Sequence, residues 1–215
     1  MKHWILKRLR SIVYIILPLI GGGWVGVSCS ESTEEEEEFA NWKVRNEAFF
    51  TSLEDSLRQA PAQWLKIKSY SLDETTEGKA TDYVYAKVIR SGEGTDSPMS
   101  TDSIRVSYKG RLIPSASYKE GYVFDSGSNY GAYDDDTNAT TKFVMLASGS
   151  EALITGWITA LLHMHRGDYW RIYIPSELGY GTSGSGSKVP GHSVLIFDLT
   201  LVDFSPAGEA MKPYN

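Results

Sequence analysis

Four runs of alternating or continuous apolar residues constrain this chain most strongly, because each is bounded by loops rich in glycine, serine, aspartate and asparagine. The runs are DYVYAKVI (82–89), SIRVSYKGRL (103–112), WRIYIP (170–175) and VLIFDLTLVDF (194–204). An apolar residue at every second position is typical of a β-strand with one buried face. The sequence therefore predicts an α+β domain over roughly residues 68–204, with several antiparallel strands and one short helix.

The short helix is expected from LITGWITALLHMHRG, where Gly156 and Trp157 stand at its start and Gly167 at its end. A tryptophan beside a glycine at a helix start has two interpretations. The indole packs in the core, or it forms the floor of a pocket. Periodicity alone favours the core without excluding the pocket.

The first 28 residues have the order of a secretory signal. The first ten residues contain four basic side chains, and residues 1–28 contain no acidic one. An apolar stretch that ends in small residues follows the basic segment. The alternative is a retained transmembrane helix, but Pro18 and the glycines at 21–23 make a poor continuous span. The sequence GVSC resembles a bacterial lipoprotein box. That resemblance implies a signal peptide over 1–28, lipidation of Cys29 and a location in the cell envelope of a Gram-negative bacterium.

An acidic segment follows Cys29 and includes five consecutive glutamates at 34–38. Such a run must stay solvated, so residues 29–38 are expected to be a tether. The segment also resembles acidic stretches that route some lipoproteins to the cell surface, so a periplasm-facing and a surface-exposed domain both remain open. Residues 29–215 carry 17 basic and 27 acidic residues, a net charge of −10 that disfavours nucleic acid as a partner.

An amphipathic helix is predicted to follow the tether, within an extension over 39–66. One stripe of it holds the apolar residues Phe39, Trp42, Phe49, Phe50, Leu53 and Leu57. The helix should end before Pro61. It either docks on the domain or serves as a homodimerisation arm, because an aromatic stripe needs a partner surface.

Familiar catalytic groupings are absent from the sequence. It contains no GxSxG, no GxxxxGK[ST] and no HExxH, and the single cysteine excludes a multi-cysteine metal site. No metal or cofactor is therefore expected. The remaining feature is a surplus of aromatic residues near loops, which either line a cavity or fill a small core: Tyr108, Phe124, Trp157, Tyr180 and Phe197.

Five motifs occur in an order that resembles the FK506-binding-protein type of peptidyl-prolyl cis-trans isomerase. They are VSYKGRL (106–112), VFDS (123–126), LITGW (153–157), IPSELGYG (174–181) and VPGHSVLIFDLTLVDF (189–204). The resemblance covers about residues 82–204. It implies a twisted antiparallel sheet wrapped around one short helix, placed here over 67–205 with a C-terminal tail at 206–215.

The resemblance also implies a site and an activity. The enzyme would rotate Xaa-Pro bonds of proline-containing polypeptides and so assist protein folding in the envelope. Asp125, Tyr180 and Tyr108 would be its catalytic residues. The substrate-binding walls and floor would be Phe124, Leu153, Ile154, Trp157, Val189 and Phe197. Asp125 has an equally weighted alternative, which is a structural hydrogen bond that holds the following loop.

Two other functions remain open. The first is a chaperone module that holds extended polypeptide without isomerising it. The second is a surface lipoprotein that binds glycans through exposed aromatics. Two segments, 126–141 and 145–152, are longer than the family pattern, and a chaperone module would use such expanded loops. The longer first segment also leaves open whether Phe143 is a pocket residue or a sheet residue.

Overall fold

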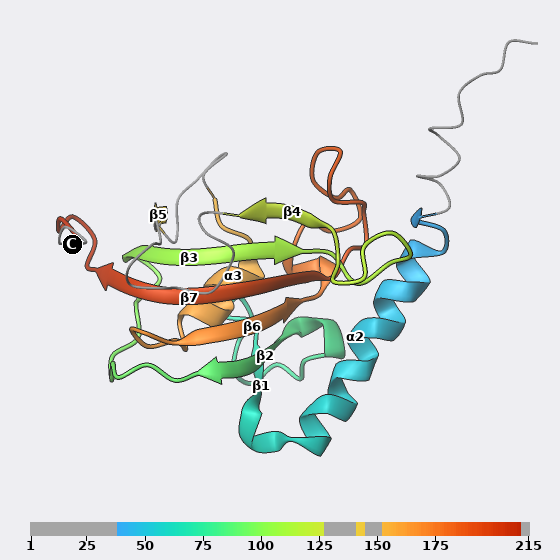
Figure 1. Cartoon of the computed structure of the whole chain (residues 1–215). Coiled ribbons are helices and arrows are strands. Elements are labelled where there is room, and N and C mark those ends of the chain that lie inside the picture. The colour runs from blue at the N-terminus through green and yellow to red at the C-terminus, as the bar shows by residue number, and fades with distance from the viewer. Residues whose placement is uncertain (1–37, 127–140, 145–151, 212–215) are drawn as a thin grey trace, which may run out of the picture.

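One curved antiparallel sheet dominates the computed structural model, which describes residues 38–126, 141–144 and 152–211. The described residues form seven strands in the order β1-β2-β6-β7-β3-β4, and β5 pairs with β3 beside β4 (Figure 1). Their bounds are β1 Trp64–Lys68, β2 Tyr83–Arg90, β3 Ser103–Arg111, β4 Val123–Ser126, β5 Thr141–Val144, β6 Tyr169–Ile174 and β7 Leu195–Ser205. The four predicted strands are confirmed as β2, β3, β6 and β7, and these four lie next to one another.

The longest strand, β7, forms the middle of the sheet because it pairs with β6 on one side and β3 on the other. Its sequence is rich in leucine, isoleucine, valine and phenylalanine, which suits a strand buried on both faces. Phe197 and Leu199 project to one face and Asp198 to the other, since side chains alternate along a strand.

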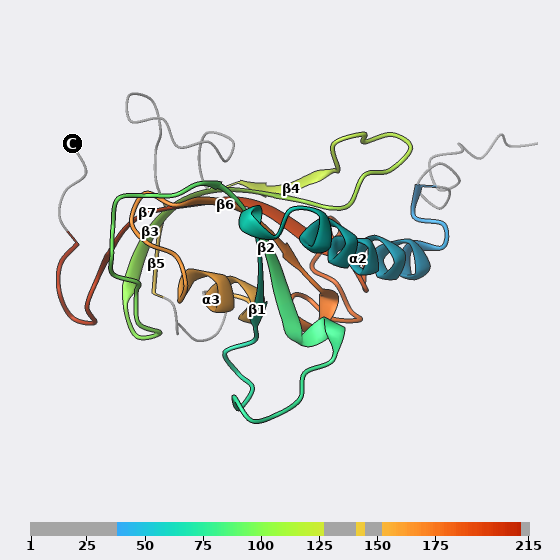
Figure 2. The ribbon, with the colours of Figure 1, turned by 90° about the horizontal axis from the view of Figure 1, so that it is seen from below.

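Helix α3, Thr155–Leu161, lies on the concave face of the sheet (Figure 2). A helix of seven residues is unstable alone, so its stability comes from burial of nearly every side chain it carries. Gly156 makes this packing close, because a Cβ atom there would clash with the side chain of Ile174 in β6.

The predicted end of this helix at Gly167 is wrong, because α3 ends at Leu161. The carboxylate of Asp168 explains the difference. It accepts the backbone N–H of His165 at 2.8 Å and that of Gly92 at 2.7 Å. A side chain that binds backbone donors in this way competes with the helical pattern and favours a turn. Met164 is nevertheless fully buried.

The N-terminal helix α2, Trp42–Gln59, packs its apolar stripe on its own domain. Trp42, Phe50 and Leu53 belong to the main hydrophobic core. Phe50 contacts Tyr85 of β2 edge-on, with 5.2 Å between the ring centroids. The stripe is therefore covered within the chain, and the docked helix is the arrangement observed.

The sheet begins earlier than expected from the predicted extension over 39–66. After α2, Pro61–Gln63 form a 3-10 turn, η1, and β1 starts at Trp64. Trp64 pairs with Lys87 of β2 and stacks on Tyr173 of β6 at 5.4 Å. Two further 3-10 turns are η2, Ala80–Asp82, and η5, Ser176–Leu178. In the described part of the chain, no helix is long and apolar enough to cross a membrane.

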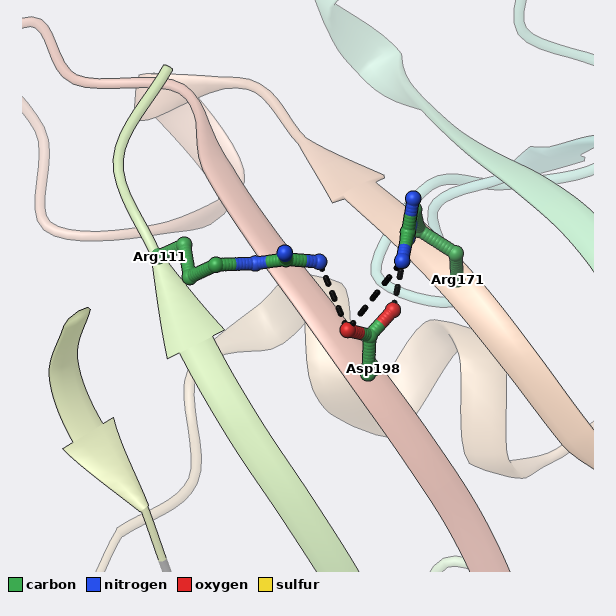
Figure 3. Close-up of polar contacts among 3 residues, drawn as sticks. All are labelled: Arg111, Arg171 and Asp198. Carbon is green, nitrogen blue, oxygen red and sulfur yellow. Dashed lines mark hydrogen bonds and ion pairs between the residues drawn. The ribbon is translucent and has the colours of Figure 1, made fainter. Parts of the chain in front are cut away.

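A charge cluster that is buried at Asp198 and Arg111 and partly exposed at Arg171 joins three adjacent strands on the sheet face opposite α3. Asp198 of β7 accepts a hydrogen bond from Arg111 of β3 at 2.6 Å and another from Arg171 of β6 at 2.6 Å (Figure 3). Asp198 is 3% exposed. A charge that is withdrawn from water in this way is tolerated because it is paired on both sides.

Candidate active site

Four aromatic residues from different elements form one cluster above the concave face of the sheet. The indole of Trp157 in α3 meets the rings of Tyr108 and Phe197 edge-on, with centroid distances of 4.8 and 5.1 Å. Phe197 in turn meets Phe124 of β4 at 5.5 Å. Such edge-to-face contacts add to the stabilisation that burial provides. Trp157 is 3% exposed and contacts rings from two strands, so its role in core packing is confirmed.

The cluster follows from the register of the strands. Tyr108 lies on the same face of β3 as Ile104 and Val106, and it therefore points toward α3. Gly110, two residues on, pairs with Phe197 on one side and with Asp125 on the other. Strands β7 and β4 thus place two predicted site residues, Phe197 and Asp125, on opposite sides of the same position in β3.

Asp125 stands at the edge of the aromatic cluster, next to Phe124, with its side chain exposed. The hydroxyl of Tyr108 donates to its Oδ2 atom at 3.1 Å. Burial raises the pKa of Tyr108, and the negative charge of Asp125 and this hydrogen bond raise it further. Burial and the same negative charge also raise the pKa of Tyr180. Both phenols therefore keep their protons at neutral pH and can act as hydrogen-bond donors.

The remaining predicted wall residues come from two loops. Leu153 and Ile154 precede α3 and pack against the main core, which also includes Val189. The loop that carries Val189 folds back on itself, because the backbone groups of Val189 and Ser185 exchange two hydrogen bonds. It also reaches β4, where the ammonium of Lys188 lies 3.5 Å from the carbonyl oxygen of Phe124.

All nine predicted catalytic and substrate-binding residues thus lie in the described part of the chain. Rings or hydrogen bonds connect Tyr108, Phe124, Asp125, Trp157 and Phe197 directly. The predicted lipidation site, Cys29, lies outside the described residues, as do the side chain of Phe143 and most of the two expanded segments. Among the described residues, no group of three or more histidine, cysteine, aspartate or glutamate side chains could hold a metal ion.

Gly110 is a residue of the aromatic cluster that the sequence pattern did not reveal. A Cβ atom at this position would lie 2.6 Å from Cε1 of Phe197 and 2.8 Å from Cζ of Phe124. The absence of a side chain is thus what allows these two rings to meet. The available signal was a glycine inside an otherwise regular strand, which often marks a close approach.

Replacing Gly110 with alanine is expected to push the two rings apart, to destabilise the fold by about 1–3 kcal/mol and to weaken ligand binding. Urea unfolding and peptide titration measure the two effects. Gly208→Ala is the matched control. It adds a methyl group at a positive φ where nothing lies within 4 Å, so it should cost about 1–2 kcal/mol without affecting binding. Binding that stays at the wild-type level in Gly110→Ala would contradict this role.

The raised tyrosine pKa values predict a loss of stability in alkali. Besides Tyr108 and Tyr180, burial and a hydrogen bond to Glu54 raise the pKa of Tyr85 to about 12. In the unfolded chain these phenols ionise near pH 10. Above that pH the folded chain binds more protons than the unfolded one, so the free energy of unfolding falls as pH rises. Urea midpoints between pH 8 and 11 test this, and a midpoint that is level or rising above pH 10 would oppose it.

The fold and the cluster together define the class: a small α+β domain with an aromatic cluster beside one carboxylate. The family model described as FKBP-type peptidyl-prolyl cis-trans isomerase matches residues 94–202, about half of the chain. The chain belongs to this family.

Two similar proteins give the extent of the likeness. The macrophage infectivity potentiator of Trypanosoma cruzi is 34% identical over 126 residues, which are 59% of this chain and 55% of that protein. The FKBP-type 22 kDa peptidyl-prolyl cis-trans isomerase of Escherichia coli is 37% identical over 117 residues, 54% of this chain and 48% of that protein. The chain thus spans about half the length of these relatives.

Proposed function

We propose that this chain is a peptidyl-prolyl cis-trans isomerase that acts on Xaa-Pro bonds of polypeptides. The observation that carries the proposal is the aromatic cluster of Tyr108, Phe124, Trp157 and Phe197 beside the Tyr108–Asp125 hydrogen bond. It occurs in a member of a family described by that activity.

The chemistry needs no nucleophile. Rotation about the Xaa-Pro bond breaks no σ-bond, and its barrier of about 18–20 kcal/mol arises because amide resonance must be lost. The planar amide is more polar than the twisted one. An aromatic site that excludes water therefore stabilises the twisted amide more than the planar one, and this difference lowers the barrier.

Each residue has a role in this proposal. The proline ring sits on Trp157, between apolar walls that include Phe197 and Val189. The hydroxyl of Tyr180 donates to the substrate carbonyl that precedes the proline. The carboxylate of Asp125, held by Tyr108, lies next to the rotating carbonyl.

A protein substrate tests the function. The chain should accelerate the slow refolding phase of a protein with a native cis-proline, which takes tens of seconds without a catalyst. A slow phase whose rate does not depend on the concentration of the chain would contradict the proposal. Slower aggregation of the refolding protein without that acceleration would favour a holding chaperone instead.

We further propose that Cys29 is lipidated and anchors the domain in a bacterial envelope. The support is the order of basic residues, apolar stretch and GVSC in the sequence. In cells supplied with a labelled fatty acid, the wild-type chain should take up the label and Cys29→Ala should not. An unlabelled wild-type chain would contradict lipidation. The homodimer predicted through 39–57 has weaker support, because the apolar stripe of that helix packs on the core of its own chain. The mass of the soluble chain, measured by sedimentation, distinguishes a monomer from a dimer.

A further inference from the structure

Two buried hydrogen bonds join α2 to the segment that leads into β7. The indole Nε1–H of Trp42 donates to Oγ of Ser193 at 2.8 Å, and the backbone N–H of Val194 donates to Oδ1 of Asn46 at 2.8 Å. The partners of each bond lie about 150 residues apart in sequence. The amide of Asn46 is also fixed in orientation, because its Nδ2 donates to the carbonyl of Trp42 at 2.7 Å. We call these two bonds between α2 and residues 193–194 the helix clamp.

The helix clamp continues into the loop that carries two proposed site residues. Oγ of Ser193 donates to the carbonyl of Pro190 at 2.6 Å, and Pro190 directly follows Val189. The backbone N–H of His192 donates to the carbonyl of Gly181 at 2.9 Å, and Gly181 directly follows Tyr180. Val189 and Tyr180 are therefore each followed directly by a residue whose carbonyl accepts one of these hydrogen bonds.

The backbone of His192 indicates that the segment is held under constraint. Its φ is 64°, in the left-handed region, which is uncommon for residues other than glycine although histidine enters it more often than most. Residues in such conformations persist when the surrounding structure holds them there. The bonds on both sides of His192, at Gly181 and at Ser193, provide that hold.

Apolar packing fixes one part of this contact, because Trp42, Phe50 and Val194 belong to the same hydrophobic core. Beside that contact a half-open pocket of about 380 Å³ lies between α2 and the loop, and its lining includes Lys43 of the helix and Thr182 and His192 of the loop. Along the pocket the loop has no close-packed neighbour on the helix, so the helix clamp is the polar link that holds its last residues to α2.

We propose that Asn46 and Trp42 are positioning residues for the substrate site. Through them, α2 holds the loop that carries Tyr180 and Val189 in the position that substrate binding requires. The inference rests on the proposed function for its kinetic consequence, whereas its structural consequence stands alone. Loss of the clamp should let the 180–193 loop move, and this would misplace Val189 and Tyr180 without removing either residue.

The experiment compares Asn46→Ala and Ser193→Ala with Leu53→Ala. Leu53 is a buried residue on the same helix, and its truncation costs stability without touching the clamp. For both clamp variants we expect KM for a proline peptide to rise about tenfold and kcat to fall as well, because the displaced residues include Val189 of the wall and the proposed catalytic residue Tyr180. Leu53→Ala should keep the wild-type KM. If Asn46→Ala does not fold, Trp42→Phe removes the donor and keeps an aromatic ring.

An NMR measurement separates this inference from the proposed function. The methyl signals of Val189 and the amide signal of Tyr180 should shift in the clamp variants and not in Leu53→Ala, whether or not the wild type isomerises proline. Unshifted signals would overturn the inference even in an active enzyme. So would equal shifts, or an equal rise in KM, in all three variants. If the wild type has no isomerase activity but the signals shift as expected in the clamp variants, only the proposed function is refuted.

Discussion

Replacement of Asp198 with alanine is expected to lower the free energy of unfolding by about 3–5 kcal/mol. The variant would leave Arg111 and Arg171 without the carboxylate that both contact. The Arg111 side chain is 9% exposed, so its charge cannot regain full hydration in the folded state. The cost comes from an uncompensated buried charge rather than from the loss of attraction alone.

Urea unfolding at neutral pH measures this loss, and Asp203→Ala is its matched control. Asp203 also lies on β7 and pairs with an arginine, Arg166, at 2.8 Å, but its side chain is 25% exposed and that of Arg166 is 40% exposed. An exposed pair contributes about 1 kcal/mol or less. A similar small loss in the two variants would contradict the view that the Asp198 cluster joins the three central strands.

Replacement of Asp125 with alanine is expected to lower kcat/KM for an Xaa-Pro peptide about a hundredfold, with little change in stability. Loss of one positioned electrostatic group commonly costs a factor of this size. Asp125 is exposed, so its removal creates no cavity. The variant would also deprive the hydroxyl of Tyr108 of its acceptor.

Asp125→Asn distinguishes the two interpretations of this residue. Asparagine keeps an oxygen that can accept from Tyr108 and removes the negative charge. Activity that is lost in both variants would assign the effect to the charge, and activity that survives in Asp125→Asn would assign it to the hydrogen bond. Wild-type kcat/KM in Asp125→Ala would exclude Asp125 from the catalytic site.

The four central strands could be predicted because their alternating apolar residues reflect burial, which the sequence records directly. The short strands β1, β4 and β5 have four or five residues each, too few for a period of two to stand out. The apolar stripe of α2 indicated that some surface covers it. Only the structure identifies that surface as the chain's own core, because amphipathicity carries no information about the partner.

Part of the candidate site could likewise be predicted from the sequence, and part could not. Tyr108, Phe124, Asp125, Trp157 and Phe197 followed from the family resemblance, and the structure brings them together. The space at Gly110 and the clamp through Asn46 and Ser193 depend on contacts between residues distant in sequence. A glycine in a strand and two polar residues elsewhere have many structural uses, so their roles became visible only when their neighbours were known.

The most direct test of the central claim is exchange between the cis and trans forms of a short Xaa-Pro peptide, measured by NMR with a soluble chain that begins after Cys29. We expect wild type to accelerate exchange at catalytic concentrations, and Asp125→Ala and Phe197→Ala to lose most of that acceleration while remaining folded. An unchanged exchange rate in the presence of folded wild type would contradict the claim, and the family fold would then serve to bind polypeptide without isomerising it.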